Sequence, residues 1–249
     1  MTNISEQKKT IYPDDKRKDE LAVNPYMYYV LRPLSFWPTI WLSRIGMSAN
    51  ACTLLSGIVL FLGLASVFLF AIRDQFYFGL TIGAALVNFY YYLDVLDGNI
   101  ARLNGKTSKL GSFLDETLNS IAGVLVPIAF GLVIFFSPDD FNNMFSFVPD
   151  YIWIILGFSI ALFRIFRRVI TNHVSLLLGT VGDRSNVLGE NRTGPKYWAS
   201  ILNSISFPLL FVSALLNLVP LWLIVYSFFN LSVFGYTLLW AYMKLEKVG

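Results

Sequence analysis

The sequence is poor in the residues that build many soluble catalytic sites. It contains one cysteine, Cys52, which excludes an internal disulfide and a cysteine metal cluster. Its single histidine, His173, argues against a histidine-centred zinc site and against a Ser-His-Asp triad. Charged residues make up only 14% of the 249 residues, whereas a soluble domain carries about 25%. This shortage indicates that much of the chain does not face water.

The residues that are abundant point to a membrane. Hydrophobic residues make up 55% of the chain and its mean hydropathy is +0.58, with 22 Phe, 13 Tyr and 6 Trp. This composition excludes a disordered chain, and a core of this length cannot hide so much apolar surface. A bilayer core needs roughly 20 apolar residues per helix. Six stretches meet this need: Ala51–Ile72, Tyr77–Leu93, Ser112–Phe136, Tyr151–Ile170, Trp198–Leu218 and Leu221–Met243.

Three regions follow from the distribution of polar residues. Residues 1–24 are mostly polar, which predicts a mobile cytosolic tail. Residues 25–46 mix aromatic and basic residues, as an amphipathic helix at the membrane interface does, although a packed loop is the alternative. Residues 47–249 then form the membrane domain. The predicted fold is an all-α integral membrane protein with six transmembrane helices after a cytosolic interfacial helix.

The basic residues predict the orientation. With six spans, 18 of the 19 Lys and Arg residues fall in regions on one side, and only Arg73 falls on the other. Basic residues collect on the cytosolic side of membrane proteins. We therefore expect a multi-pass protein with both termini in the cytosol.

Acidic residues stand at two helix ends where they are costly. Asp94 and Asp97 end the second span, and Asp115 begins the third. They either cap helix ends at the interface or form a site. The negative end of the helix dipole disfavours carboxylates at a C-terminus, so a bound cation would relieve the pair there. Asp115 and Asn119 share one helix face. Ligands that are all oxygen select a hard cation such as Mg²⁺, Mn²⁺ or Ca²⁺.

The acidic residues belong to a longer pattern. The chain reads Asp94-x₂-Asp97-Gly98-x₂-Ala101-Arg102-x₈-Gly111-x₃-Asp115-x₃-Asn119. This resembles the signature of the CDP-alcohol phosphotransferase family, D-x₂-D-G-x₂-A-R-x₈-G-x₃-D-x₃-D, with the spacing intact and only the last position different. Asn50 and Thr53 resemble the family's entry into the first span, and Arg32-Pro33-Leu34-Ser35 resembles a motif of the preceding helix in some members.

The resemblance implies a reaction and a site at the cytosolic face. A CDP-alcohol gives its substituted phosphate to the hydroxyl of a second alcohol and releases CMP, one of the two alcohols being a lipid. Two divalent cations, Mg²⁺ or Mn²⁺, would be held by Asp94, Asp97, Asp115 and Asn119. The nucleotide would be bound by Asn50, Thr53, Asp94, Asp97, Gly98, Ala101, Arg102 and Gly111. Family members often form dimers, so we expect a homodimer, and we expect membrane lipids but no nucleic acid as partners.

Asn119 departs from the family, which has an aspartate here as a metal ligand and general base. An amide oxygen still ligates a hard cation, but it does not accept a proton at neutral pH. Three interpretations remain open. Asn119 is a natural variant whose proton passes to another group, the chain is an impaired or non-catalytic relative, or the residue is an engineered change. The predicted catalytic pair is Asn119 and Asp115.

Weaker signals leave alternatives open. Arg164 and Arg168 share a helix face and either bind the phosphate of an acceptor or lipid, or anchor the helix at the membrane surface. Anchoring is favoured for Arg167. Asn50 and Thr53 either contact the substrate or cap a helix. A cation-coupled transporter is the rival class of function, because intramembrane carboxylates also mark ion pathways.

Overall fold

The computed structural model describes residues 4–137, 144–179 and 195–246, and every regular element in these ranges is a helix. The predicted all-α fold is confirmed. The elements are α1 (Ile4–Ile11), α2 (Asp14–Val23), η1 (Met27–Leu31), α3 (Arg32–Arg44), α4 (Ala49–Ala71), α5 (Phe76–Leu103), α6 (Lys109–Phe135), α7 (Tyr151–Leu177), α9 (Pro195–Leu215) and α10 (Val219–Glu246).

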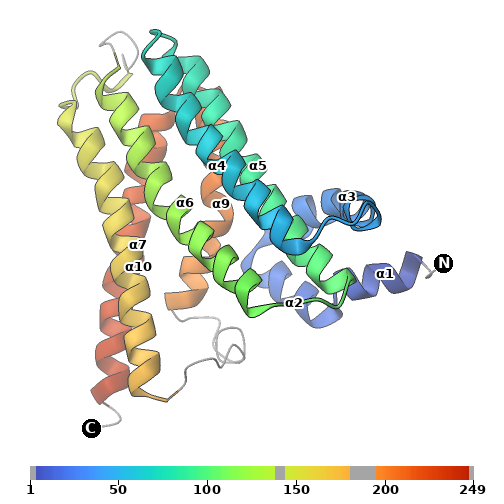
Figure 1. The fold of residues 1–249 in the computed structure, drawn as a ribbon. Helices are drawn as coiled ribbons and strands as arrows, with labels where there is room; N and C mark the ends of the chain where they lie inside the picture. Colours follow the sequence, from blue (N-terminus) through green and yellow to red (C-terminus); the bar gives the residue numbers. More distant parts are fainter. Residues whose placement is uncertain (1–3, 138–143, 180–194, 247–249) are drawn as a thin grey trace.

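Five of these helices have the length and apolar composition to cross a membrane: α4, α5, α6, α9 and α10. The sixth predicted span, α7, has 27 residues and packs beside α6 and α10 along the bundle (Figure 1). Arg164, Arg167 and Arg168 lie near the middle of α7, so every 18-residue stretch of this helix carries three charges, whereas each of the other five has a stretch with two or fewer. Its role as a span therefore stays a prediction, whereas the multi-pass character of the chain is clear.

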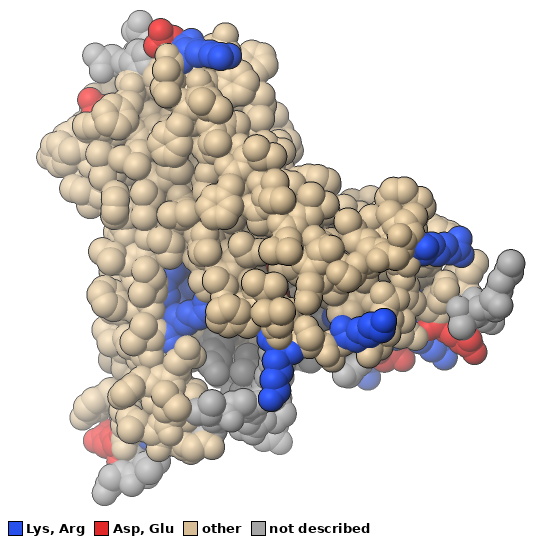
Figure 2. Space-filling view, viewed as in Figure 1, with Lys and Arg blue, Asp and Glu red and all other residues tan. Residues whose placement is uncertain are grey.

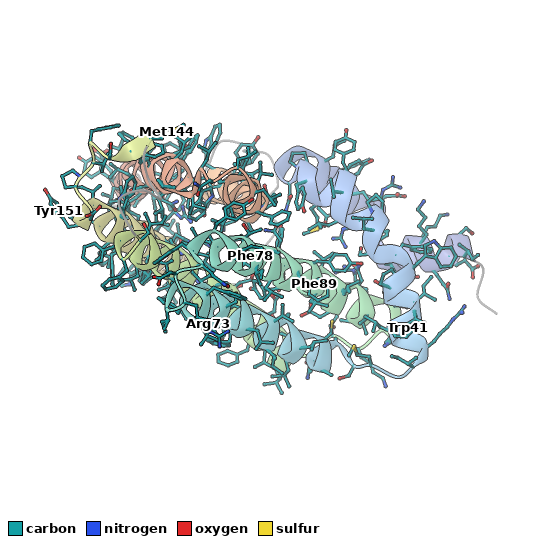
Figure 3. All side chains as sticks on the ribbon, turned by 90° about the horizontal axis from the view of Figure 1, so that it is seen from above. Trp41, Arg73, Phe78, Phe89, Met144 and Tyr151 are labelled. Atoms are coloured by element: carbon teal, nitrogen blue, oxygen red, sulfur yellow. The ribbon has the colours of Figure 1, made fainter. Side chains whose placement is uncertain are left out.

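The surface has the character that a lipid environment requires. On the face shown in Figure 2, a broad uncharged band separates the charged side chains of the upper end from those of the lower half. Large apolar side chains are exposed on the long helices, including Phe78 and Phe89 of α5 (Figure 3). Lipid covers such side chains at no cost, whereas water does not.

Small residues let the helices approach closely. A Cβ added at Gly83 of α5 would lie only 3.0 Å from the carbonyl oxygen of Gly63 of α4. On the other side of the bundle, a Cβ at Gly157 of α7 would lie 2.5 Å from the carbonyl oxygen of Pro127 of α6. Close backbone approach supplies the dispersion contacts that hold membrane helices together, because lipid competes for apolar surface. This packing fixes α5 against α4 and α7 against α6.

The first 24 residues differ from the predicted mobile tail. Helices α1 and α2 and the two residues between them, Tyr12 and Pro13, make up residues 4–23. We call this segment the N-terminal helix pair. Ile11 is fully buried and Tyr12 is nearly so, both against Phe36, Ile40 and Leu103. The sequence hid this because, among the side chains of the pair that the structure describes, only Ile11 and Tyr12 are buried, and they stand in a polar stretch.

The region after the N-terminal helix pair is helical, so the packed-loop alternative for residues 25–46 is wrong. Helix α3 buries Ser35, Thr39 and Ile40 against the protein, while Leu34, Trp37 and Trp41 are exposed on its other face. It packs against α5 and lies at an angle to the long helices (Figure 1). An exposed row of leucine and tryptophan is typical of a helix in the membrane interface.

Candidate functional site

The seven matched positions of the sequence motif line one cavity, which we call the first cavity. It has a volume of about 380 Å³ and lies where the ends of α4, α5 and α6 meet. Its lining includes every residue that the sequence assigned to the nucleotide, together with Asp115: Asn50, Thr53, Asp94, Asp97, Gly98, Ala101, Arg102, Gly111 and Asp115. The spacing of the motif therefore reflects one continuous wall built by two helices and their loop.

Helix capping decides one alternative that the sequence left open. Ser48 is the N-cap of α4, because its hydroxyl accepts the N–H of Ala51 at 3.1 Å. Asn50 and Thr53 are thus free of capping and belong to the first cavity. The Thr53 hydroxyl donates to Asp97 Oδ2 at 2.5 Å. A Cβ at Gly111 would lie 2.8 Å from Asn50 Oδ1, so a larger residue would displace that side chain.

Asn119 links the carboxylates on α5 and α6. Its Nδ2 donates to Asp115 Oδ1 at 2.6 Å and to Asp94 Oδ1 at 3.2 Å. Its Oδ1 accepts the hydroxyl of Tyr90, a fully buried residue of α5, at 2.8 Å. The amide thus supplies two N–H groups to two like charges that would otherwise repel. Tyr90 was not identified from the sequence, where it reads as one of three consecutive tyrosines.

The first cavity has the donor chemistry of a hard cation site. Asp94, Asp97 and Asp115 all line it, and carboxylate oxygens are the preferred ligands of Mg²⁺ and Mn²⁺. Within the described ranges, no three histidine, cysteine or acidic side chains already converge as a metal site does. The chemical type of these ligands therefore fits a divalent cation. In this structure Asp94 and Asp115 are instead hydrogen-bonded to the Asn119 amide.

A second cavity of about 510 Å³ lies on the other side of Asn119. It is lined from α6 by Asn119 and Ser120, from α9 by polar residues that include Asn203, and from α7 by Arg164, Arg167 and Arg168. Because Asn119 lines the second cavity and bonds to two residues of the first, it stands between the two. The structure thus places the three arginines next to the motif.

The three arginines differ in how they are held. Arg164 donates to the Tyr226 hydroxyl at 2.7 Å, and Arg168 pairs with Glu116 and donates to Ser120. Arg167 is only 7% exposed, and its buried Nη1 has no partner among the described residues. Arg167 is therefore packed inside the protein, whereas an anchoring arginine exposes its charged end. An unpaired guanidinium nitrogen, on a side chain that lines a cavity together with two further arginines, suits an anionic ligand.

Sequence reasoning also missed a second set of residues at the first cavity. Glu20 of α2 and Arg32 of α3 line it, and Asn99 of α5 bonds to both Arg32 and Arg102. Arg32 carried a weak signal as part of a motif shared with some family members. Glu20 carried none, because nothing in a polar segment shows which carboxylate meets an arginine 12 residues later.

Comparison with known proteins agrees with this geometry. Residues 47–241 match the model of the CDP-alcohol phosphatidyltransferase family. Over 84 residues the chain is 34% identical to a phosphatidylinositol phosphate synthase of Streptomyces avermitilis. The aligned stretch covers 33% of this chain and 31% of that protein. Over 92 residues it is 32% identical to an archaetidylinositol phosphate synthase of Pyrococcus horikoshii, covering 36% and 45% respectively. The chain thus matches less than half the length of each relative. Because the family match spans most of the chain and includes both cavities' central residues, the chain belongs to the CDP-alcohol phosphatidyltransferase family.

Proposed function

We propose that the protein is a membrane transferase that moves a substituted phosphate from a CDP-alcohol to the hydroxyl of a second alcohol. The observation that carries this proposal is that all seven matched motif positions line one cavity, with a basic second cavity directly beyond Asn119. The acceptor oxygen forms a bond to the phosphorus that carries the first alcohol. The bond from this phosphorus to the bridging oxygen breaks, and CMP leaves.

The donor is assigned to the first cavity. Asp94, Asp97 and Asp115 would hold Mg²⁺ or Mn²⁺ there, and such cations neutralise the charge of the pyrophosphate when bound. Gly98 and Ala101 leave the wall of α5 bare, so that the nucleotide approaches the backbone closely. We place this site at the cytosolic face, because the basic residues surround this end of the bundle.

The acceptor is assigned to the second cavity, and we propose that it carries a phosphate. Three arginines line this cavity, and the unpaired Nη1 of Arg167 offers a donor that no described protein group satisfies. Both relatives are named as synthases of a lipid-linked inositol phosphate. We extend this to the chain: the lipid is attached to CDP, and the acceptor is a phosphorylated polyol. A homodimer remains an expectation from the family.

Asn119 changes how the proton of the acceptor hydroxyl is removed. Its amide does not accept a proton, whereas the Asp115 carboxylate lies 2.6 Å from Asn119 Nδ2 and lines the first cavity. We assign proton acceptance to Asp115, and we assign to Asn119 the task of orienting that carboxylate at the boundary between the cavities. Loss of a general base typically costs about 10²–10⁴-fold in rate. Proton acceptance by Asp115 avoids this loss.

The proposal is tested by CMP release from the purified protein with Mg²⁺ or Mn²⁺. CDP-diacylglycerol is offered with inositol phosphate and, as the matched control, with inositol. CMP release with the phosphorylated acceptor and little with inositol is expected. Equal release with both acceptors would refute the assignment of the second cavity. If no donor and acceptor pair yields CMP while CDP-alcohol protects the protein from heat, the protein is a non-catalytic binder.

A further inference from the structure

We propose that the N-terminal helix pair is a positioning element of the first cavity, which sets the two arginines that face the anionic part of the CDP donor. This inference rests on the proposed function. It concerns residues outside the sequence motif, Ile11, Tyr12 and Glu20, and assigns them an effect on donor binding.

Docking is both apolar and polar. The side chains of Ile11 and Tyr12 are buried against Phe36, Ile40 and Leu103, which belong to α3 and the end of α5. The Tyr12 hydroxyl donates to the carbonyl oxygen of Arg32 at 2.8 Å and lies 2.8 Å from Ser35 Oγ. Burial raises the pKa of Tyr12 above its ordinary value of 10.0, so the hydroxyl stays neutral and bonded at neutral pH. The helix pair is thus fixed to the elements that form the cavity.

Glu20 then holds Arg32. Its carboxylate accepts two hydrogen bonds from the guanidinium, one from Nε at 2.7 Å and one from Nη2. The two side chains are only 12% and 9% exposed, and both residues line the first cavity. A bidentate pair fixes both the position and the plane of the guanidinium. A nearly buried arginine without this partner would carry an unbalanced charge and a free choice of rotamer.

Asn99 transmits this order to Arg102. It is fully buried, and its Nδ2 donates to Ser35 Oγ at 3.1 Å and Thr39 Oγ1 at 3.2 Å. Its Oδ1 accepts Nη1 of Arg32 and Nη2 of Arg102, both at 2.6 Å. One amide oxygen therefore joins the two guanidinium groups. If Arg32 moves, Asn99 and with it Arg102 lose a fixed partner.

The helix pair also contacts Arg102 directly. Arg102 Nε donates to the backbone carbonyl of Ile11 at 3.0 Å. Two of its three nitrogens are thus held by protein groups, and the third, Nη1, lies against the bare face of Gly98, 3.5 Å from where a Cβ would be. This nitrogen borders the cavity at the motif. The arrangement leaves the Nη1 amino group, with its two N–H donors, for a ligand, while Nε and Nη2 are held by protein groups.

The charges explain which ligand this arrangement suits. Glu20 pairs with Arg32 alone, so the positive charge of Arg102 at this end of the cavity has no carboxylate bonded to it among the described contacts. Asp94, Asp97 and Asp115 line the same cavity. A pyrophosphate with divalent cations matches such a divided field, because its oxygens face both the cations and the arginines. Loosening the arginines therefore weakens binding of the donor, and the acceptor in the second cavity is not affected.

The test compares Glu20→Gln with Glu6→Gln, which removes the same charge from an exposed position of the same helix pair. Glu20→Gln is expected to raise the KM for the CDP donor about tenfold, the effect of losing one oriented charged contact, with kcat and the acceptor KM unchanged. Glu6→Gln is expected to match the wild type. A change of kcat and both KM values together would indicate a merely structural role and overturn the proposal.

A second variant and a second readout keep the test decisive. Tyr12→Phe removes only the hydroxyl that holds Arg32, so it serves if Glu20→Gln does not fold, and a smaller rise of the same KM is expected. The second readout is the affinity for CDP, measured from the rise of the melting temperature with CDP concentration, and it needs no turnover. Wild-type affinity in both variants would refute the positioning role and leave the proposed function intact. If the wild type neither binds CDP nor releases CMP, both proposals fail.

Discussion

Replacing Asn119 with aspartate converts the link between α5 and α6 into a fourth carboxylate. In the structure the Asn119 amide donates to Asp115 at 2.6 Å and to Asp94 at 3.2 Å. The variant loses both N–H groups and gains two like-charge contacts. Two unit charges ~4 Å apart repel by about 4 kcal/mol at an effective dielectric constant of ~20. Without metal, the folded variant is therefore less stable than the folded wild type.

The size of the effect follows from how much repulsion survives relaxation. If side-chain movement and water leave about 2 kcal/mol, Tm without metal falls by roughly 4–8 °C, because 1 kcal/mol corresponds to about 2–4 °C in a chain of this size. A divalent cation reverses the sign, since it binds four carboxylates more tightly than three and stabilises the folded state by mass action. Asn119→Asp is thus expected to gain more from Mg²⁺ than the wild type does.

The assay is thermal unfolding in detergent, with EDTA and then with increasing Mg²⁺ or Mn²⁺. The matched control is Asn104→Asp at the end of α5, an exposed amide that lines neither cavity and accepts from Ser43 at 2.7 Å, as a carboxylate also does. The control is expected to show no metal-dependent change relative to the wild type. If Asn119→Asp melts like the wild type in EDTA, the role of Asn119 as a link between the carboxylates is refuted. If Mg²⁺ raises the Tm of the variant no more than that of the wild type, the metal assignment is refuted.

Three further predictions concern the second cavity and the N-terminal helix pair. Arg167→Gln is expected to raise the acceptor KM about tenfold and leave the donor KM unchanged, because it removes the unpaired donor; equal effects on both substrates would contradict the assignment. Gly123→Ala places a Cβ 2.5 Å from Arg164 Nη2, so it should raise the acceptor KM and cost about 1–3 kcal/mol, as overpacking does; wild-type kinetics and melting would show that Arg164 moves freely. The stabilisation from neutral Tyr12 is fully present below pH 10.0 and is lost as the pH rises through its raised folded-state pKa; in an alkaline melting series Tyr12→Phe should therefore lose less stability than the wild type, and identical curves would contradict this.

The sequence was sufficient for the parts of the site that lie on consecutive helical turns. Asp94, Asp97, Gly98, Ala101 and Arg102 share a face because the helical period fixes their directions over about two turns. The apolar length of the spans predicted the helices themselves. Both kinds of prediction depend on local geometry, which needs no knowledge of distant contacts.

Contacts between distant segments were not predictable in the same way. Glu20 meets Arg32 and Ile11 meets Arg102 only because the N-terminal helix pair docks on α3 and α5. Nothing in a polar stretch states which of its few apolar residues will be buried. The burial of Arg167 likewise depends on how α7 packs against its neighbours, since the basic pattern alone is the same for an anchor and for a ligand site.

The central claim is that the phosphorus attached to the first alcohol moves with that alcohol to the acceptor, at the cavity lined by the motif. Its most direct test is the fate of a CDP-lipid labelled with ³²P at that phosphorus, incubated with acceptor and Mg²⁺ or Mn²⁺. The account predicts that the label appears in the lipid product, that the released CMP is unlabelled, and that a folded Asp97→Ala variant yields neither. Label in CMP or in free phosphate, or full activity of Asp97→Ala, would contradict it.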